Sequence, residues 1–314
     1  MPHHKPARAA AALFAALALQ PAAQAGELAA SVRAQFGSQS LQAGELRWAD
    51  GPLRSVLTAT RIDGGGIRPR LNELTYDRAF AGGFLTVGKK VMSWDVGYAF
   101  RPLDVVQRED RRALIPLALE GIPMLAWERF DSDSATTFAW ANPTRGRADQ
   151  ARDDEAIAIR HYRQRGARDE YAVLRLSRRN VMEAGASFSQ VASDGLELHA
   201  SLLWQQRPAH GGKALAGFTW TTESKLSIIG EMWTDRSAGP GQQRNRMLRA
   251  AQYFDDVEVA ADLLWQPQTG SRIGTLSASW KSGPWTLAAS YRRYGGLAGR
   301  YMQDTALASI QRGF

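Results

Sequence analysis

Apolar and polar side chains alternate along most of this chain with a period of two residues. In residues 196–206, LELHASLLWQQ, apolar positions such as Leu198 and Leu202 are separated by polar positions such as Glu197 and His199. The same alternation recurs in the segments starting near residues 182, 214, 257, 274 and 285. Successive side chains of a β-strand point to opposite faces, so this period predicts strands with one apolar and one polar face.

These predicted strands are too long for an ordinary soluble β-sandwich. They run for about ten residues, whereas typical strands have about five or six. A transmembrane strand needs about 9–11 residues when it is tilted, and aromatic residues gather at both membrane interfaces. Several segments have a tryptophan at or near one of their two ends, namely Trp204, Trp220, Trp265, Trp280 and Trp285. The pattern therefore predicts an all-β fold, a transmembrane antiparallel up-and-down β-barrel.

The spacing of the segments predicts about sixteen strands, and a range of twelve to eighteen stays open. The expected strands are 53–61, 71–80, 84–92, 123–131, 135–142, 155–163, 169–178, 181–192, 196–206, 213–222, 226–235, 246–254, 257–266, 272–281, 285–294 and 304–314. The links between them mostly alternate between short and long. Short periplasmic turns and longer outer loops are typical of outer-membrane barrels.

The first residues are typical of an export signal. A short basic lead is followed by an apolar stretch from Ala9 to Leu19 and by the small-x-small site Ala23-Gln24-Ala25. We therefore expect residues 1–25 to be a signal peptide, 26–50 an N-terminal periplasmic segment, and 51–314 the barrel. The expected location is the outer membrane.

The chain ends in Phe314, after Ala306, Ala308 and Ile310 on one face of the last predicted strand. A terminal aromatic residue on such a strand resembles the signal that the barrel assembly machinery reads. We therefore expect that machinery to be a partner through Phe314.

One long link, from Met92 to Gly121, breaks the alternation. A link of this length in a compact domain is usually functional. We expect the loop at residues 94–120 to fold into the barrel and narrow it, with a pore constriction formed by Arg101, Asp104, Arg108, Arg111 and Arg112. A solvated surface loop and a misread pair of strands remain open as alternatives.

The polar face of the strands is expected to line a water-filled lumen. The lumen-facing candidates are Glu197, His199, Glu231, Glu258, Asp262, Arg175 and Arg292. With the further inward candidates Lys90, Arg160, Lys281, Glu73 and Asp77, the face carries five basic and six acidic side chains, and this near balance predicts weak charge selectivity. The formal charge of +8 is spread along the chain, so nucleic-acid binding is not expected.

The stretch LNELTYDRAFAGGFLTVGKKVMSWDVGYAFRPLD, Leu71 to Asp104, resembles a segment of porin-like Gram-negative outer-membrane β-barrel proteins, including alginate-export-like and related uncharacterised groups. The matching positions are Gly88, Lys89, Trp94, Gly97, Pro102 and Asp104. Lys89 stands where arginine is usual, and Asp95 stands where glycine is usual. The resemblance implies a porin-like channel and transfers no solute-binding residue.

Three functions follow from this pattern. The first is a channel for small solutes or for export of a polymer, and the second is a non-conducting structural or assembly barrel. The third is a barrel hydrolase using His199 and Ser201, but their face is opposite the apolar one and would point away from lipid. We expect no enzyme activity, no cofactor and no metal site.

The remaining expected partners are lipids. Outer-membrane lipid would surround the barrel, and lipopolysaccharide phosphates would meet Arg145, Arg147 and Arg152 of an outer loop. We also consider a homo-oligomer, in which the partner is another copy of this chain.

Overall fold

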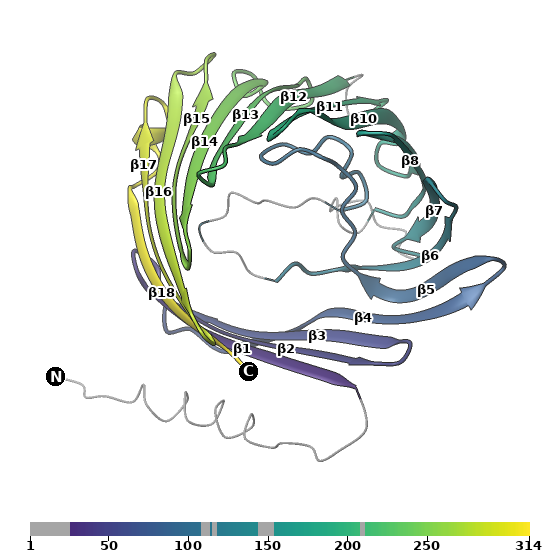
Figure 1. Ribbon diagram of the computed structural model, residues 1–314, viewed down its shortest axis with the longest axis horizontal. Coiled ribbons are helices and arrows are strands. Elements are labelled where there is room, and N and C mark those ends of the chain that lie inside the picture. Colours follow the sequence, from purple (N-terminus) through teal and green to yellow (C-terminus); the bar gives the residue numbers. More distant parts are fainter. Residues whose placement is uncertain (1–25, 108–113, 115–117, 144–153, 208–210) are drawn as a thin grey trace.

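The computed structural model describes residues 26–107, 114, 118–143, 154–207 and 211–314. They form one closed antiparallel barrel of eighteen strands (Figure 1). Each strand pairs with the next along the chain, and β1 pairs with β18 to close the ring. The strands are β1 (Glu27–Gly37), β2 (Leu41–Asp50), β3 (Leu53–Ile62), β4 (Arg68–Phe80), β5 (Gly83–Lys90), β6 (Ile122–Phe130), β7 (Ser134–Ala141), β8 (Ala156–Arg165), β9 (Arg168–Ser177), β10 (Val181–Ser193), β11 (Leu196–Gln205), β12 (Gly211–Thr221), β13 (Leu226–Asp235), β14 (Arg244–Phe254), β15 (Val257–Gln266), β16 (Ser271–Ser282), β17 (Trp285–Gly295) and β18 (Thr305–Gly313), and a short 3-10 helix η2 (Ala298–Arg300) follows β17.

The sixteen strands expected from sequence correspond to β3–β18, so the fold class is confirmed. The expected N-terminal periplasmic segment at residues 26–50 is wrong, because these residues form β1 and β2. β1 pairs with β18 on one side and with β2 on the other, from Glu27↔Ala49 to Gln35↔Leu41. Without this hairpin the edges of β18 and β3 would stay open, and an open edge leaves a row of backbone groups unpaired.

The two faces of the wall differ as the alternation predicted. The outward face is apolar. Leu198 and Leu263 are 43% and 48% exposed there, because no other part of the described chain covers them. The intervening positions face the lumen, where side chains such as His199 and Glu231 are buried. Within the described residues, no helix is long and apolar enough to cross a membrane.

The two rims of the barrel differ in the length of their connections. One rim carries both ends of the barrel and tight turns, such as that between β10 and β11, where Gly195 has φ +75°. A Cβ at Gly195 would lie 2.1 Å from the carbonyl oxygen of Thr221, so only glycine fits. The other rim carries the longer links, including residues 91–121 between β5 and β6. The β9–β10 link is a short exception on that rim.

Candidate functional site

The lumen loop, residues 91–121, runs inside the barrel rather than over its rim. Its described part comprises residues 91–107, 114 and 118–121, and it lies inside the ring beside β10–β13 in Figure 1. Met92, Trp94, Leu103 and Val106 pack in one buried cluster with wall residues of β6–β11. Leu103 has no exposed surface. Burial of each side chain of this size contributes about 1.5–3 kcal/mol, so the loop is docked on the wall.

Two aspartates close the turn of the lumen loop. Asp104 Oδ1 accepts hydrogen bonds from the backbone nitrogens of Trp94 at 2.6 Å and of Asp95 at 3.0 Å. Asp95 Oδ2 accepts one from the backbone nitrogen of Leu103 at 2.6 Å. Burial raises the pKa of both carboxyls, and the nearby Arg101 guanidinium opposes the rise.

The tip of the loop is held by side chains of the wall. Glu231 of β13 accepts hydrogen bonds from the backbone nitrogens of Tyr98 at 2.6 Å and of Ala99 at 2.8 Å. His199 Nε2 lies 3.1 Å from Glu231 Oε1. Phe100 stacks on Trp233, with ring centroids 5.6 Å apart. The wall therefore satisfies backbone groups that a segment crossing the lumen would otherwise expose.

The returning end of the loop is tied to β4 and β5. Asn72 Nδ2 donates to the carbonyl oxygens of Ala118 at 2.9 Å and Leu119 at 3.0 Å. Lys89 Nζ forms an ion pair with Glu120 Oε1 at 2.8 Å. Both ends of the loop are thereby fixed near the same rim.

The residues expected at the constriction lie in the lumen loop where the structure describes them, and they form an ion pair there. Arg101 and Asp104 come together as an ion pair at 3.1 Å, with side chains only 6% and 0% exposed. They hold the turn of the loop, and both residues also line the cavity between the loop and the wall. The sequence indicated that both lie in the loop, but whether they would pair depends on contacts that no spacing reveals. Arg108, Arg111 and Arg112 lie outside the described residues.

The expected lumen-facing residues share the inner face. Strand pairing places Gly217 opposite His199 on one side and opposite Glu231 on the other. It also places Arg249 opposite Asp262, and Thr275 opposite Arg292. We name Arg249, Asp262, Thr275 and Arg292 the polar strip. Arg249 was not expected from sequence, because the alternation in β14 is weak.

Charges in the polar strip are partly paired. Arg249 forms ion pairs with Glu258 at 2.9 Å and with Asp262 at 3.6 Å, and it lies 5.7 Å from the ring centroid of Tyr98 on the loop. Arg292 Nε donates to Thr275 Oγ1 at 3.0 Å. The strip thus offers both signs of charge to the lumen.

The remaining two predicted lumen residues hold local contacts. Glu197 accepts a hydrogen bond from Ser189 Oγ at 2.6 Å. Arg175 is buried and pairs with Asp154 at 2.9 Å and also with Glu183. Asp154 comes just before β8, so this network fixes that strand's start to β9 and β10. Sequence spacing does not reveal this pairing.

A cavity of about 840 Å³ lies between the lumen loop and the long-link rim. The loop contributes Phe100, Arg101 and Gln107, and the wall contributes groups of both signs, including Lys213 and Asp235. We name this cavity the vestibule. Its lining presents both signs of charge, with Arg101 and Lys213 among the basic groups and Asp104 and Asp235 among the acidic ones.

His199 and Ser201 are both engaged beneath the loop. Ser201 Oγ donates to Asp95 Oδ1, whereas His199 contacts Glu231, so the two side chains serve different carboxylates. The Ser201 contact ties the wall to the loop directly, and the His199 contact holds the glutamate that binds the loop tip. Among the described residues, no group of three or more acidic, histidine or cysteine side chains is arranged to hold a metal ion.

No protein-family model matches this sequence, and no curated protein matches it. Solved structures match over nearly the whole chain. Pseudomonas aeruginosa OpdQ is 9% identical, with a TM-score of 0.63, and the match covers 93% of this chain and 99% of OpdQ. A triple mutant of the Rhodopseudomonas blastica porin is 12% identical, with a TM-score of 0.54, and the match covers 92% of this chain and 100% of that porin.

A third match is Escherichia coli Wzi, described as an outer-membrane carbohydrate-binding β-barrel involved in group 1 capsule assembly. It is 10% identical, with a TM-score of 0.65, over 97% of this chain and 87% of Wzi. At these identities the matches establish the fold: the chain has the porin-like barrel fold of outer-membrane proteins.

Proposed function

We propose that this protein is an outer-membrane channel for the passive passage of small polar solutes, with its lumen narrowed by the lumen loop. One observation carries the proposal: the loop is docked on the inner wall, mainly along β6–β13 with its tip also against Met247 of β14 and Leu264 of β15, and the polar strip begins beside this tip. A loop that is fixed in this way narrows a pore without needing to move. In this role His199 and Ser201 hold the loop and catalyse nothing.

Placement in the outer membrane rests on the outward apolar belt. The chain has no cysteine, so single substitutions report cleanly on exposure. We expect Leu198→Cys, Phe218→Cys, Leu263→Cys and Leu287→Cys to resist a water-soluble maleimide in intact cells. A fluorophore attached to these cysteines should be quenched by lipid-soluble quenchers. Ser277→Cys, on the inner face of β16, is the matched control and should react. Labelling of all four belt positions at the rate of the control would contradict membrane placement.

Channel activity is tested with the purified barrel in planar bilayers and in liposomes. We expect discrete conductance steps, and swelling rates that fall as uncharged sugars of increasing size are supplied. Preparations that insert into the bilayer but never show discrete openings would exclude passive transport.

The alternatives are export of a polymer and a non-conducting barrel that scaffolds a partner. Because the similar barrel Wzi binds carbohydrate, the polymer that we consider is a carbohydrate. An oligosaccharide that blocks the conductance at micromolar concentration would support the polymer channel. Oligosaccharide binding to a barrel that never conducts would support the scaffold.

A further inference from the structure

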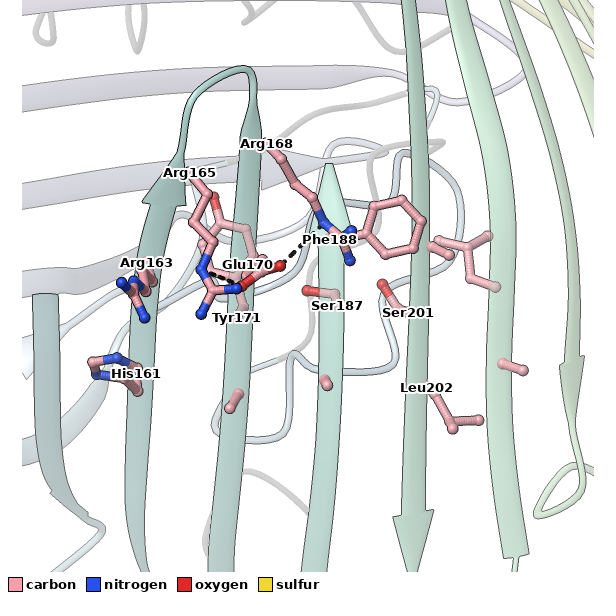
Figure 2. A pocket seen from close by; sticks show the side chains of 15 residues that line it. His161, Arg163, Arg165, Arg168, Glu170, Tyr171, Ser187, Phe188, Ser201 and Leu202 are labelled. Carbon is pink, nitrogen blue, oxygen red and sulfur yellow. Dashed lines mark ion pairs between the residues drawn. The ribbon is translucent and has the colours of Figure 1, made fainter. Parts of the chain in front are cut away.

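A second hollow lies on the outside of the barrel, away from the lumen. It is a groove of about 650 Å³ on the outward face of β8–β12 (Figure 2). The outward positions Ala172, Ala186, Ala200 and Ala214 line it. Strand pairing places Ala172 opposite Ala186 and Leu202 opposite Ala214. We name it the alanine groove.

The orientation of the alanine groove follows from the alternation. Ser201, between Ala200 and Leu202, donates its hydroxyl to Asp95 of the lumen loop and so points inward. Its two neighbours therefore point outward. Leu202 is 61% exposed, as expected for a side chain that meets lipid rather than protein. The groove is thus open to whatever surrounds the barrel.

One end of the groove is strongly basic. Arg163 and Arg165 of β8 and Arg168 of β9 line it beside the turn that joins these strands, and all three are exposed (Figure 2). Glu170 pairs with Arg165 at 3.5 Å and with Arg168 at 3.2 Å. Three arginines therefore face one glutamate. Among the described residues, Arg163 has no acidic partner.

Aromatic packing holds part of this cluster over the groove. The Arg168 guanidinium lies 4.7 Å from the ring centroid of Phe188, which is opposite Ala200 on β11. A cation held over an aromatic ring keeps its hydrogen-bonding edge available. The arginine and the apolar groove therefore form one continuous surface.

The position of the cluster matches the membrane boundary. The β8–β9 turn lies on the tight-turn rim, which also holds both ends of the barrel. Arginine side chains beside an apolar belt reach the headgroup region, where phosphates are concentrated. An amphipathic ligand with an anionic head and a narrow apolar tail fits this order of residues.

We propose that the alanine groove binds one anionic phospholipid from the leaflet at the tight-turn rim, with its phosphate on Arg163 and Arg168 and an acyl chain along Ala172, Ala186 and Ala200. This rests on the proposed membrane placement of the barrel. Charge complementarity favours a lipid over a second copy of the chain, because Glu170, the acidic residue beside the groove, is already paired with two arginines.

The test measures lipid retention on the full barrel. Delipidated protein is incubated with phosphatidylglycerol or phosphatidylcholine, and bound lipid is counted by native mass spectrometry. We expect one retained phosphatidylglycerol and at least a tenfold weaker retention of phosphatidylcholine. Arg163→Ala/Arg168→Ala should reduce phosphatidylglycerol retention at least tenfold. Arg272→Ala, an outward arginine near the opposite rim, is the matched control and should not.

A second variant tests the apolar half separately. Ala186→Trp should fill the groove and weaken phosphatidylglycerol retention at least tenfold, whereas Ala278→Trp, on the outward face of β16, should not. Circular dichroism confirms that each variant is folded. Equal retention in all variants, or equal retention of both lipids, would overturn the proposal. A changed oligomeric state with unchanged lipid retention would overturn it in favour of a second copy of the chain.

Conductance of the same variants separates this inference from the channel proposal. Lost lipid retention with unchanged conductance supports the groove and leaves the channel intact. Unchanged retention in variants that conduct normally refutes the groove alone. A wild-type barrel that inserts without conducting refutes the channel alone.

Discussion

The inner wall of the barrel has two regions with the same backbone geometry and different chemistry. Along β6–β13 the inward side chains under the lumen loop include buried apolar residues such as Met124, Val173 and Leu203. Along β14–β17 the polar strip lies at equivalent inward positions. Apolar inward residues pack against the loop, including Met247 and Leu264 against its tip, and inward polar residues beneath it such as Ser201 and Glu231 bind it, whereas the polar strip is only partly paired. What faces a strand, and not the strand itself, decides the character of its inner face.

Removing the loop should erase this difference and produce the largest effect. Lys90 pairs directly with Ile122, so a short Gly-Ser link can replace residues 92–120 without moving either strand. We expect single-channel conductance to rise several-fold, because the obstruction is gone. Thermal stability should fall, because the apolar side chains on β6–β13 that the loop covers become exposed to water. An unchanged conductance would mean that the loop does not narrow the pore.

Asp104→Ala should undock the loop while leaving it in the chain. It removes the acceptor for two backbone nitrogens and leaves Arg101 buried without its carboxylate. Breaking a buried ion pair in this way costs about 3–5 kcal/mol. We expect flickering conductance and faster proteolysis of the loop. Asp256→Ala, at an exposed turn on the tight-turn rim, is the control and should match wild type.

Glu231→Gln should loosen only the tip of the loop. The amide keeps one acceptor oxygen, whereas Glu231 uses both oxygens to bind the backbone of Tyr98 and Ala99. Loss of a charged hydrogen-bond partner costs about 1–3 kcal/mol. Faster hydrogen exchange at Tyr98 and Ala99, with unchanged exchange at Leu103, is the expected result. Equal acceleration along the whole loop would show that the loop moves as one unit.

The outward-facing residues of the wall strands could be predicted from sequence, and the inward-facing residues only in part. β11 is clear because Leu198 and Leu202 alternate with Glu197, His199 and Ser201. Lipid imposes one requirement on every outward residue, so the pattern repeats. Inward residues meet different neighbours, and these depend on where the loop folds.

The missed hairpin has the same physical cause. β1 places alanine on both faces, and β2 presents Gly44 to the outside, so neither strand has the contrast of β11. Only the closure of the ring requires them. Likewise the Arg101–Asp104 and Arg175–Glu183 pairs bring together side chains whose partners the spacing does not identify.

Arg249→Met should change selectivity more than stability, because Arg249 belongs to the polar strip and lies at the edge of the docked loop, beside Tyr98. Glu258 and Asp262 would lose their cation and face the lumen as two uncompensated carboxylates. We expect the reversal potential in a salt gradient to move toward cation preference by several millivolts, with the melting temperature within a few degrees of wild type. Arg178→Met, beside Glu155 at the long-link rim, is the matched control. A large loss of stability would show that Arg249 holds the loop through Tyr98.

Acidification should tighten the docked loop slightly. Burial raises the pKa of Asp95 and Asp104 above the ordinary value of 3.8, so the docked loop binds protons more readily than a free loop. Docking is therefore favoured as the pH falls toward 3.8 and loses this contribution as the pH rises through the raised pKa values. We expect amide protection at Trp94 and Leu103, corrected for intrinsic exchange, to rise modestly on acidification. The Asp104→Asn variant should respond less, because one titrating group is absent. Release of the loop in acid would mean that the carboxylate hydrogen bonds outweigh their desolvation.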